Sequence, residues 1–116
     1  MIVCVLDDLL FSVKISTAAK AIGTDVYFER TPGMAFARIK ERQPSLVIFD
    51  LNSARADPLA IVSAMKREAA LASVPTVGFV SHVQADLIDA ARQAGVDEVL
   101  ARSAFTARLA EILRRP

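Results

Sequence analysis

Apolar residues along this chain fall into two alternating kinds of segment. Short, nearly continuous apolar runs of strand length are each followed by a segment whose apolar residues recur every three or four positions, the spacing of one helix face. The pattern predicts strands at residues 2–6, 25–29, 45–49, 75–80 and 97–100. It predicts helices at about residues 9–22, 31–42, 57–71, 87–94 and 105–113.

Residues with strong helix-end preferences mark several of these helices. Gly23 and Gly95 are expected to end the first and fourth helices in a left-handed conformation. Thr31-Pro32 and Asp57-Pro58 each combine a side chain that can cap a helix with a proline in the first turn, so they predict two helix starts. Ser103 is the expected cap of the last helix.

Regular alternation of strands and helices favours a parallel sheet with right-handed crossovers. The strand runs are continuous instead of alternating, which is typical of strands covered by helices on both faces. Five strands are too few for an eight-stranded barrel. We therefore expect an α/β fold, a flavodoxin-like doubly wound five-stranded sheet, formed by a single domain over residues 1–116.

An acidic side chain ends the strand at residues 45–49. Asp50 directly follows this apolar run, and a strand buried on both faces places such a residue at the carboxyl edge of the sheet, where open α/β folds collect their chemistry. In a parallel sheet the other strands end at the same edge. We therefore expect Asp50 to lie near Asp7, Asp8, Ser81 and Arg102.

This set of side chains suits metal-assisted phosphoryl chemistry. Three carboxylates cannot all stay ionised close together without a compensating charge, and their hard oxygens are ligands that a partly hydrated Mg²⁺ prefers. With a metal bound, Asp50 can act as a nucleophile toward a phosphoryl group, while the Ser81 hydroxyl and the Arg102 cation steady the transferred oxygens.

Four segments make the chain resemble a known family. They are the acid pair in VLDD, the strand-end acid in LVIFDLN, the serine in VGFVSH and the stretch AGVDEVL. In their order and spacing they resemble the receiver domain of bacterial response regulators, and the resemblance covers essentially the whole chain. It implies a strand order of 2-1-3-4-5.

The resemblance also implies roles for individual residues. Asp50 would be the phospho-acceptor, Ser81 the switch hydroxyl, and Asp7, Asp8, Asp50 and the backbone carbonyl of Asn52 the Mg²⁺ ligands. A sensor histidine kinase or phosphotransfer protein would supply the phosphoryl group, and a downstream protein would bind the switched surface. Any enzymatic activity would be limited to self-phosphorylation and dephosphorylation at Asp50.

The chain departs from the family pattern after the third and fifth strands. Arg102-Ser103 stands where the family has lysine and proline, and the planar arginine fork is not equivalent to the point charge of a lysine. The loop NSARADPL lacks the family's Met-Pro and Asp-Gly pairs, and Val99 stands where an aromatic switch residue is often found. The residues that couple the site to the surface therefore differ from the family more than the acidic ones do.

These side chains also have structural alternatives. Asp7 and Asp8 can cap the first helix, whose N-terminus favours negative charge. The stretch Ser81 to Gln84 fits a capping box that would turn the hydroxyl toward the next helix. Arg102 can form an ion pair with the strand-end aspartate without any phosphoryl chemistry.

Net charge, motifs and hydropathy bear on several other classes of function. The net charge of +1 argues neither for nor against nucleic acid, and without a helix-turn-helix domain direct DNA binding is not expected. No glycine-rich phosphate loop follows a strand, which argues against flavin and dinucleotide binding. The sequence shows no convincing membrane span or signal peptide, so we expect a cytoplasmic protein. Cys4 is expected to be a buried thiol, and His82 to lie on the polar surface.

Two functions from different classes remain open. In the first, the chain is a stand-alone receiver whose phosphorylation at Asp50 changes a partner-binding surface. In the second, it is a pseudo-receiver, never phosphorylated, that serves as a constitutive interaction or dimerisation module. The sequence leaves the oligomeric state open, and a homodimer through the last helix is compatible with it. The retained acids favour the first function. Arg102-Ser103 in place of the family's lysine and proline, and Val99 in place of the aromatic residue, favour the second.

Overall fold

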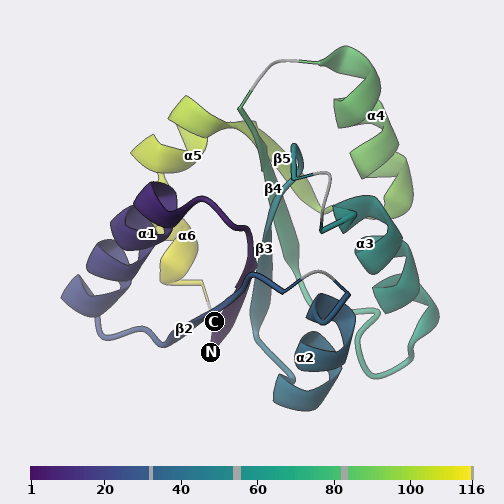
Figure 1. The fold of residues 1–116 in the computed structure, drawn as a ribbon, viewed down its shortest axis with the longest axis horizontal. Helices are drawn as coiled ribbons and strands as arrows, with labels where there is room; N and C mark the ends of the chain where they lie inside the picture. Colours follow the sequence, from purple (N-terminus) through teal and green to yellow (C-terminus); the bar gives the residue numbers. More distant parts are fainter. Residues whose placement is uncertain (32, 54–55, 82–83, 116) are drawn as a thin grey trace.

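The computed structural model describes residues 1–31, 33–53, 56–81 and 84–115. Its centre is a parallel sheet with the strand order β2-β1-β3-β4-β5, which confirms the predicted topology (Figure 1). Every strand lies within one residue of its predicted span. The strands are β1 (Ile2–Val5), β2 (Val26–Glu29), β3 (Leu46–Asp50), β4 (Thr76–Val80) and β5 (Glu98–Ala101).

Helices cover both faces of the sheet, as a doubly wound fold requires (Figure 1). One face carries α1 (Leu9–Ala21), α5 (Arg102–Ala107) and α6 (Leu109–Leu113). The other carries α2 (Ala35–Arg42), α3 (Pro58–Arg67) and α4 (Ala85–Ala94). Among the described residues, none of these helices combines the length and the apolar character that a bilayer crossing requires.

Successive strand side chains enter two separate hydrophobic cores, one beneath each helix layer. On β3, Ile48 packs in the core below α1, whereas Val47 and Phe49 pack in the core below α2 and α3. Both faces of the strand are therefore apolar, which explains the continuous runs in the sequence. Cys4 is fully buried, as predicted, and burial raises the pKa of its thiol far above the usual range.

The second helix begins later than predicted. α2 starts at Ala35, whereas Thr31 lies before it and donates its backbone N–H to Glu29 Oε2 at 3.0 Å. The buried Glu29 carboxylate thus binds the backbone amide of the residue that was predicted to cap the helix, so the predicted cap at Thr31 is wrong. Gly33 follows with a left-handed φ of 82°, so the chain turns once more before the helix begins. Pro32 lies outside the described residues.

The third helix starts where predicted but ends early. α3 begins at Pro58, yet Asp57 makes no capping hydrogen bond through its side chain and has a left-handed φ of 47°. The helix ends at Arg67, short of the predicted end near Leu71, because the backbone of Glu68 is extended. Leu71 is buried, but it belongs to a separate turn that follows the helix. Apolar spacing alone does not distinguish such a turn from a continuing helix.

The last helix is divided and has no serine cap. β5 runs directly into α5 at Arg102, which leaves Ser103 inside the helix, so the predicted cap at Ser103 is wrong. Arg108 separates α5 from α6. The predicted left-handed ends are confirmed, since Gly23 and Gly95 have φ angles of 72° and 115°.

A glycine in β4 makes room for the residue that follows Asp50. A Cβ atom on Gly78 would lie 2.6 Å from Leu51 Cδ1 and 2.8 Å from Leu51 Cγ. Leu51 is only 4% exposed, so the side chain has little freedom to withdraw. The absence of a side chain at Gly78 therefore sets the position of the chain just beyond the end of β3.

We predict that Gly78→Ala destabilises the protein by roughly 1–3 kcal/mol, because it overpacks this contact. Leu51→Ala alone should also destabilise, by about 2–5 kcal/mol, because it leaves a cavity. The double variant should lose less than the sum of the two, since the smaller side chain relieves the clash. Urea unfolding of the four proteins measures this coupling, and strictly additive losses would contradict the contact.

Candidate functional site

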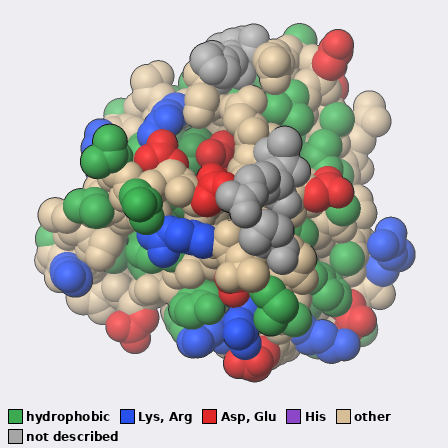
Figure 2. Space-filling model, in the orientation of Figure 1, with side chains coloured by type: hydrophobic (Ala, Val, Ile, Leu, Met, Phe, Trp, Pro, Cys, Tyr) green, Lys and Arg blue, Asp and Glu red, His purple; other side chains and the backbone are tan. Residues whose placement is uncertain are grey.

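The carboxyl ends of the strands bring acidic side chains together, as predicted. Asp50 is the last residue of β3, Asp7 and Asp8 follow β1, and Arg102 follows β5. Their electrostatic influence on one another shows the proximity, because Asp7, Asp8 and Arg102 all affect the pKa of Asp50. Figure 2 shows acidic side chains gathered near the middle of one face of the molecule.

Asp50 is a half-buried carboxylate held by the turn that follows it. Its Oδ1 atom accepts the backbone N–H of Asn52 at 3.0 Å. Burial raises the pKa of Asp50 above its ordinary value; the Asn52 hydrogen bond and Arg102 oppose the rise, whereas Asp7 and Asp8 add to it. Within the described residues Oδ2 has no hydrogen bond, so one oxygen of this carboxylate is open to react.

Asp8 is engaged through both of its carboxylate oxygens. Oδ1 accepts the backbone N–H of Phe11 at 3.0 Å, which caps α1, and Oδ2 accepts Nη2 of Arg102 at 2.9 Å. The Phe11 hydrogen bond, followed by the bond from Arg102, lowers the pKa of Asp8. The capping alternative is thus confirmed for Asp8. The suggested pairing of Arg102 with Asp50 is wrong, because the guanidinium reaches the carboxylate that lies nearer to α1.

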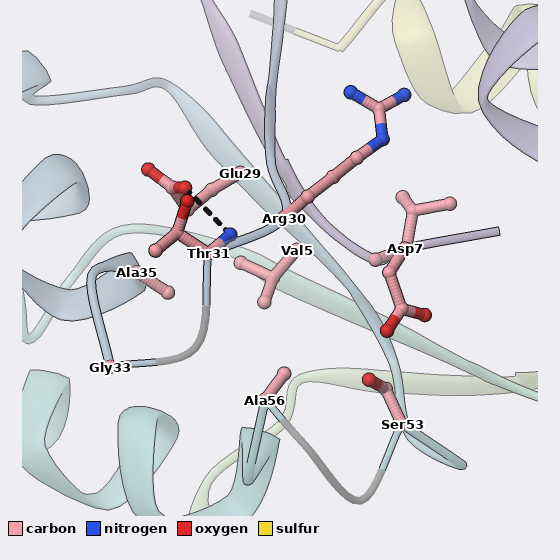
Figure 3. A pocket seen from close by; sticks show the side chains of 10 residues that line it. Val5, Asp7, Glu29, Arg30, Thr31, Gly33, Ala35, Ser53 and Ala56 are labelled. Carbon is pink, nitrogen blue, oxygen red and sulfur yellow. Dashed lines mark hydrogen bonds between the residues drawn. The ribbon is translucent and has the colours of Figure 1, made fainter. Parts of the chain in front are cut away.

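Asp7 faces a different space from its neighbour. It lines a small hollow of about 10 Å³ together with Thr31 and Ser53, and Figure 3 shows its carboxylate pointing toward Ser53. A hollow of this size accommodates about one water molecule. The side chains of these two consecutive residues therefore point in different directions. Asp7 is directed toward the loop after β3, and Asp8 is directed toward α1 and Arg102.

Asn52 connects the loop after β3 to the loop after β4. Its side-chain Oδ1 accepts the backbone N–H of Ser81 at 2.6 Å. The predicted capping box is wrong, because α4 begins at Ala85 with Gln84 in the cap position. Ser81 is exposed and, among the residues that the structure describes, makes no hydrogen bond to the Asp50 carboxylate. His82 lies outside the described residues.

The oxygen atoms at this edge are ligands of the kind that a divalent cation binds, but the described residues are not arranged as a metal site. Burial raises the pKa of Asp50 and the carboxylates of Asp7 and Asp8 add to the rise, so a cation would stabilise the ionised acids, and Mg²⁺ prefers oxygen ligands of this kind. Within the described part of the chain, however, no group of three or more His, Cys, Asp or Glu residues is placed to hold a metal ion. Asp8 instead forms an ion pair with Arg102, at 2.9 Å.

Two features of the site were not predicted from the sequence. The guanidinium carbon of Arg102 lies 4.2 Å from the centre of the Phe11 ring. Leu9, Leu10 and Val13 are 66%, 85% and 63% exposed on α1, and hydrophobic side chains are visible over this helix at the left of Figure 2. Their positions outside the apolar stripe of α1 were a usable signal, because large apolar residues off the buried face must be exposed.

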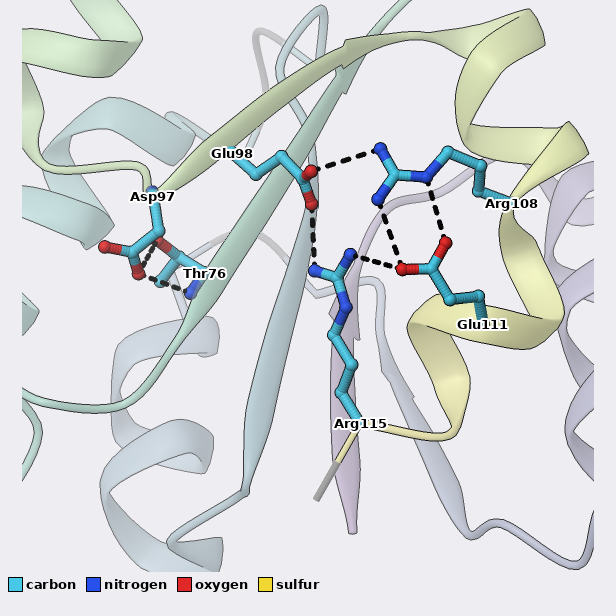
Figure 4. Close-up of polar contacts among 6 residues, drawn as sticks. All are labelled: Thr76, Asp97, Glu98, Arg108, Glu111 and Arg115. Atoms are coloured by element: carbon cyan, nitrogen blue, oxygen red, sulfur yellow. Dashed lines mark hydrogen bonds and ion pairs between the residues drawn. The ribbon is translucent and has the colours of Figure 1, made fainter.

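Two arginines near the C-terminus, Arg108 and Arg115, form a charge network with two glutamates. Arg108 and Arg115 both bind Glu98 on β5, at 3.2 Å and 2.8 Å, and both also bind Glu111 (Figure 4). The hydrogen bond from Arg108, followed by that from Arg115, lowers the pKa of Glu111 to about 2. The network fastens α6 to β5 at a distance from the acidic edge.

Several solved structures share this fold. The Mn²⁺-bound form of the response regulator Rcp1 superposes with a TM-score of 0.82 at 20% identity, covering 99% of this chain and 95% of that chain. The chemotaxis protein CheY4 of Vibrio cholerae gives 0.84 at 16% identity, over 98% and 95% of the two chains. The receiver domain of the sensor histidine kinase PA1611 of Pseudomonas aeruginosa, solved with a magnesium ion in its active site cleft, gives 0.84 at 18% identity, over 98% and 93%.

These likenesses show that the chain has the fold of response regulator receiver domains, which confirms the expected fold. At the level of sequence, no family model matches the chain. No curated protein is significantly similar to it either.

We predict that Asp50→Asn stabilises the folded protein at neutral pH. Because the pKa of Asp50 is raised in the folded protein, the ionised carboxylate destabilises the folded state. This destabilisation is absent below the ordinary pKa of about 3.9, grows as the pH rises toward the folded-state pKa, and is complete above it. Thermal unfolding between pH 4 and pH 8 should show the variant gaining on the wild type with rising pH. Asp57→Asn, which removes an exposed acid, is the matched control. A variant less stable than the wild type at pH 7 would contradict the prediction.

Proposed function

We propose that this chain is a receiver-like signalling domain of a two-component phosphorelay that accepts a phosphoryl group on Asp50. The observation that carries the proposal is the open Oδ2 oxygen of a half-buried carboxylate at the carboxyl edge of the sheet. The backbone N–H of Asn52 binds the other oxygen, Oδ1, and so orients the nucleophile. The fold that the chain shares with solved response regulators supports this assignment.

The transfer step is a displacement at phosphorus. Asp50 Oδ2 attacks the phosphorus atom, the bond from phosphorus to the donor's nitrogen or oxygen breaks, and its electron pair leaves with the donor. Ser81 is proposed as the switch hydroxyl and Arg102 as the cation in place of the family lysine. In the structure the Arg102 guanidinium binds Asp8, so it must change partner to reach the phosphoryl oxygens. The backbone N–H of Ser81 binds Asn52 Oδ1, which holds this residue in the loop after β4.

The proposal includes a divalent cation. Asp7, Asp8, Asp50 and the backbone carbonyl of Asn52 would hold Mg²⁺, in keeping with the metal-bound receiver structures of the same fold. When bound, the ion supplies positive charge that offsets the carboxylates and the incoming phosphoryl oxygens. The chain's own contribution is to place these carboxylates at one edge and to orient Asp50.

A protein partner would deliver the phosphoryl group, as a sensor histidine kinase or a phosphotransfer protein does. The exposed apolar residues of α1 directly follow the acid pair along the chain. Exposed apolar patches of this kind commonly mark protein interaction sites. A downstream protein target would then recognise the phosphorylated form; direct binding of nucleic acid is not part of the proposal.

A second candidate function is a pseudo-receiver that works as a constitutive interaction or dimerisation module without phosphorylation. The ion pair between Arg102 and Asp8 favours it, because this pair balances part of the acidic charge within the chain itself.

We predict that acetyl phosphate with Mg²⁺ adds a phosphoryl group to the wild-type protein and not to Asp50→Asn. Intact mass spectrometry detects the adduct, and an acyl phosphate should be lost on treatment with hydroxylamine. Asp57→Asn is the matched control, because it removes an acid from the same loop region and should react like the wild type. If the wild type remains unmodified while a known receiver reacts in parallel, the pseudo-receiver function is favoured and the phosphoryl acceptor is ruled out.

A further inference from the structure

The partner of Arg102 is the most informative departure of this site from a metal-binding arrangement. Arg102 Nη2 lies 2.9 Å from Asp8 Oδ2, and the other Asp8 oxygen is already used by the Phe11 amide. Both oxygens of Asp8 are therefore engaged while this pair is closed, and a cation that binds Asp8 must share its oxygens with these donors. The two side chains are 37% and 36% exposed, so water can reach the pair and it can open.

A second contact fixes the guanidinium from the other side. Arg102 lies over the ring of Phe11, with its central carbon 4.2 Å from the ring centre. Phe11 is buried and packs against Phe79 and Phe105, at ring distances of 4.9 Å and 5.8 Å. The planar guanidinium can stack on an aromatic face and bind a carboxylate at the same time, which a lysine ammonium cannot do as well.

The charges at this edge of the sheet also favour competition between Arg102 and a metal ion. Asp7, Asp8 and Asp50 are the acids at this edge, and Arg102 is the described basic residue that acts on Asp50. A divalent cation would need the same carboxylates and would be repelled by a guanidinium held among them. Arg102 and the metal are thus alternatives for one position of positive charge.

We propose that Arg102 is a resident cation that competes with a divalent metal ion for Asp8, so that the metal binds when the guanidinium leaves. This inference depends on the metal part of the proposed function and not on phosphoryl transfer. It makes the Arg102 side chain a regulator of how readily the acidic edge takes up a metal. Phe11 is a positioning residue in this arrangement, because it holds the guanidinium next to Asp8.

The test measures binding of Mn²⁺ alone, by the loss of the electron paramagnetic resonance signal of the free ion. Arg102→Gln should bind Mn²⁺ about fivefold to tenfold more tightly than the wild type, because a charge-assisted hydrogen bond no longer competes. Arg114→Gln is the matched control. It removes the same charge from an exposed position near the C-terminus and should bind like the wild type.

The possible outcomes are distinct. Equal affinities for the wild type and Arg102→Gln overturn the competition and leave the metal site of the proposed function in place. If neither protein binds the ion, both the competition and the metal site are overturned, whereas the acetyl phosphate experiment judges the phospho-acceptor separately. An equal gain in Arg114→Gln would show a general charge effect and would also overturn the proposal.

A measurement on the wild type covers the case in which Arg102→Gln fails to fold, as judged by circular dichroism. The side-chain Nε–H resonance of Arg102 can be followed by nuclear magnetic resonance while Mg²⁺ is added. We expect it to shift toward the position of a solvent-exposed arginine as the metal binds. A resonance that stays unchanged at saturating Mg²⁺ would overturn the competition.

Discussion

The parallel direction of the strands is the constraint on which the whole site depends. Because the strands all end at the same edge, the residues after β1, β3 and β5 meet there although they lie far apart in the sequence. The same constraint creates an electrostatic problem, because burial at this edge raises the pKa of Asp50 and the neighbouring carboxylates of Asp7 and Asp8 add to the rise. The backbone N–H of Asn52 and the guanidinium of Arg102 oppose that rise. The capping hydrogen bond from Phe11, followed by the bond from Arg102, lowers the pKa of Asp8.

The architecture was predictable because it depends on patterns that extend over many residues. A strand buried on both faces needs a continuous apolar run, and the alternation of such runs with helical spacing favours a parallel doubly wound sheet. The predicted strands were confirmed to within one residue. The meeting of Asp7, Asp8, Asp50 and Arg102 followed from the topology alone.

The local details were harder to predict because several weak interactions compete for the same groups. Thr31 had the features of a helix cap, yet the buried Glu29 carboxylate binds its amide. Ser103 also resembled a cap, but β5 continues into α5 without a loop. Likewise, the sequence places Arg102 near all the acids and cannot choose among them. The choice of Asp8 depends on the Phe11 ring beneath the guanidinium, which only the folded structure reveals.

The Asp8 carboxylate caps α1 and is also a proposed metal ligand, and this affects how a substitution at that position can be interpreted. Replacement by alanine would remove a possible metal ligand and also the cap of α1, and loss of a cap alone costs about 0.5–2 kcal/mol of stability. A phenotype of such a change would therefore mix chemistry with folding. Asparagine keeps an oxygen for the Phe11 amide while removing the charge, so genetic evidence on this residue is informative only when the two replacements are compared.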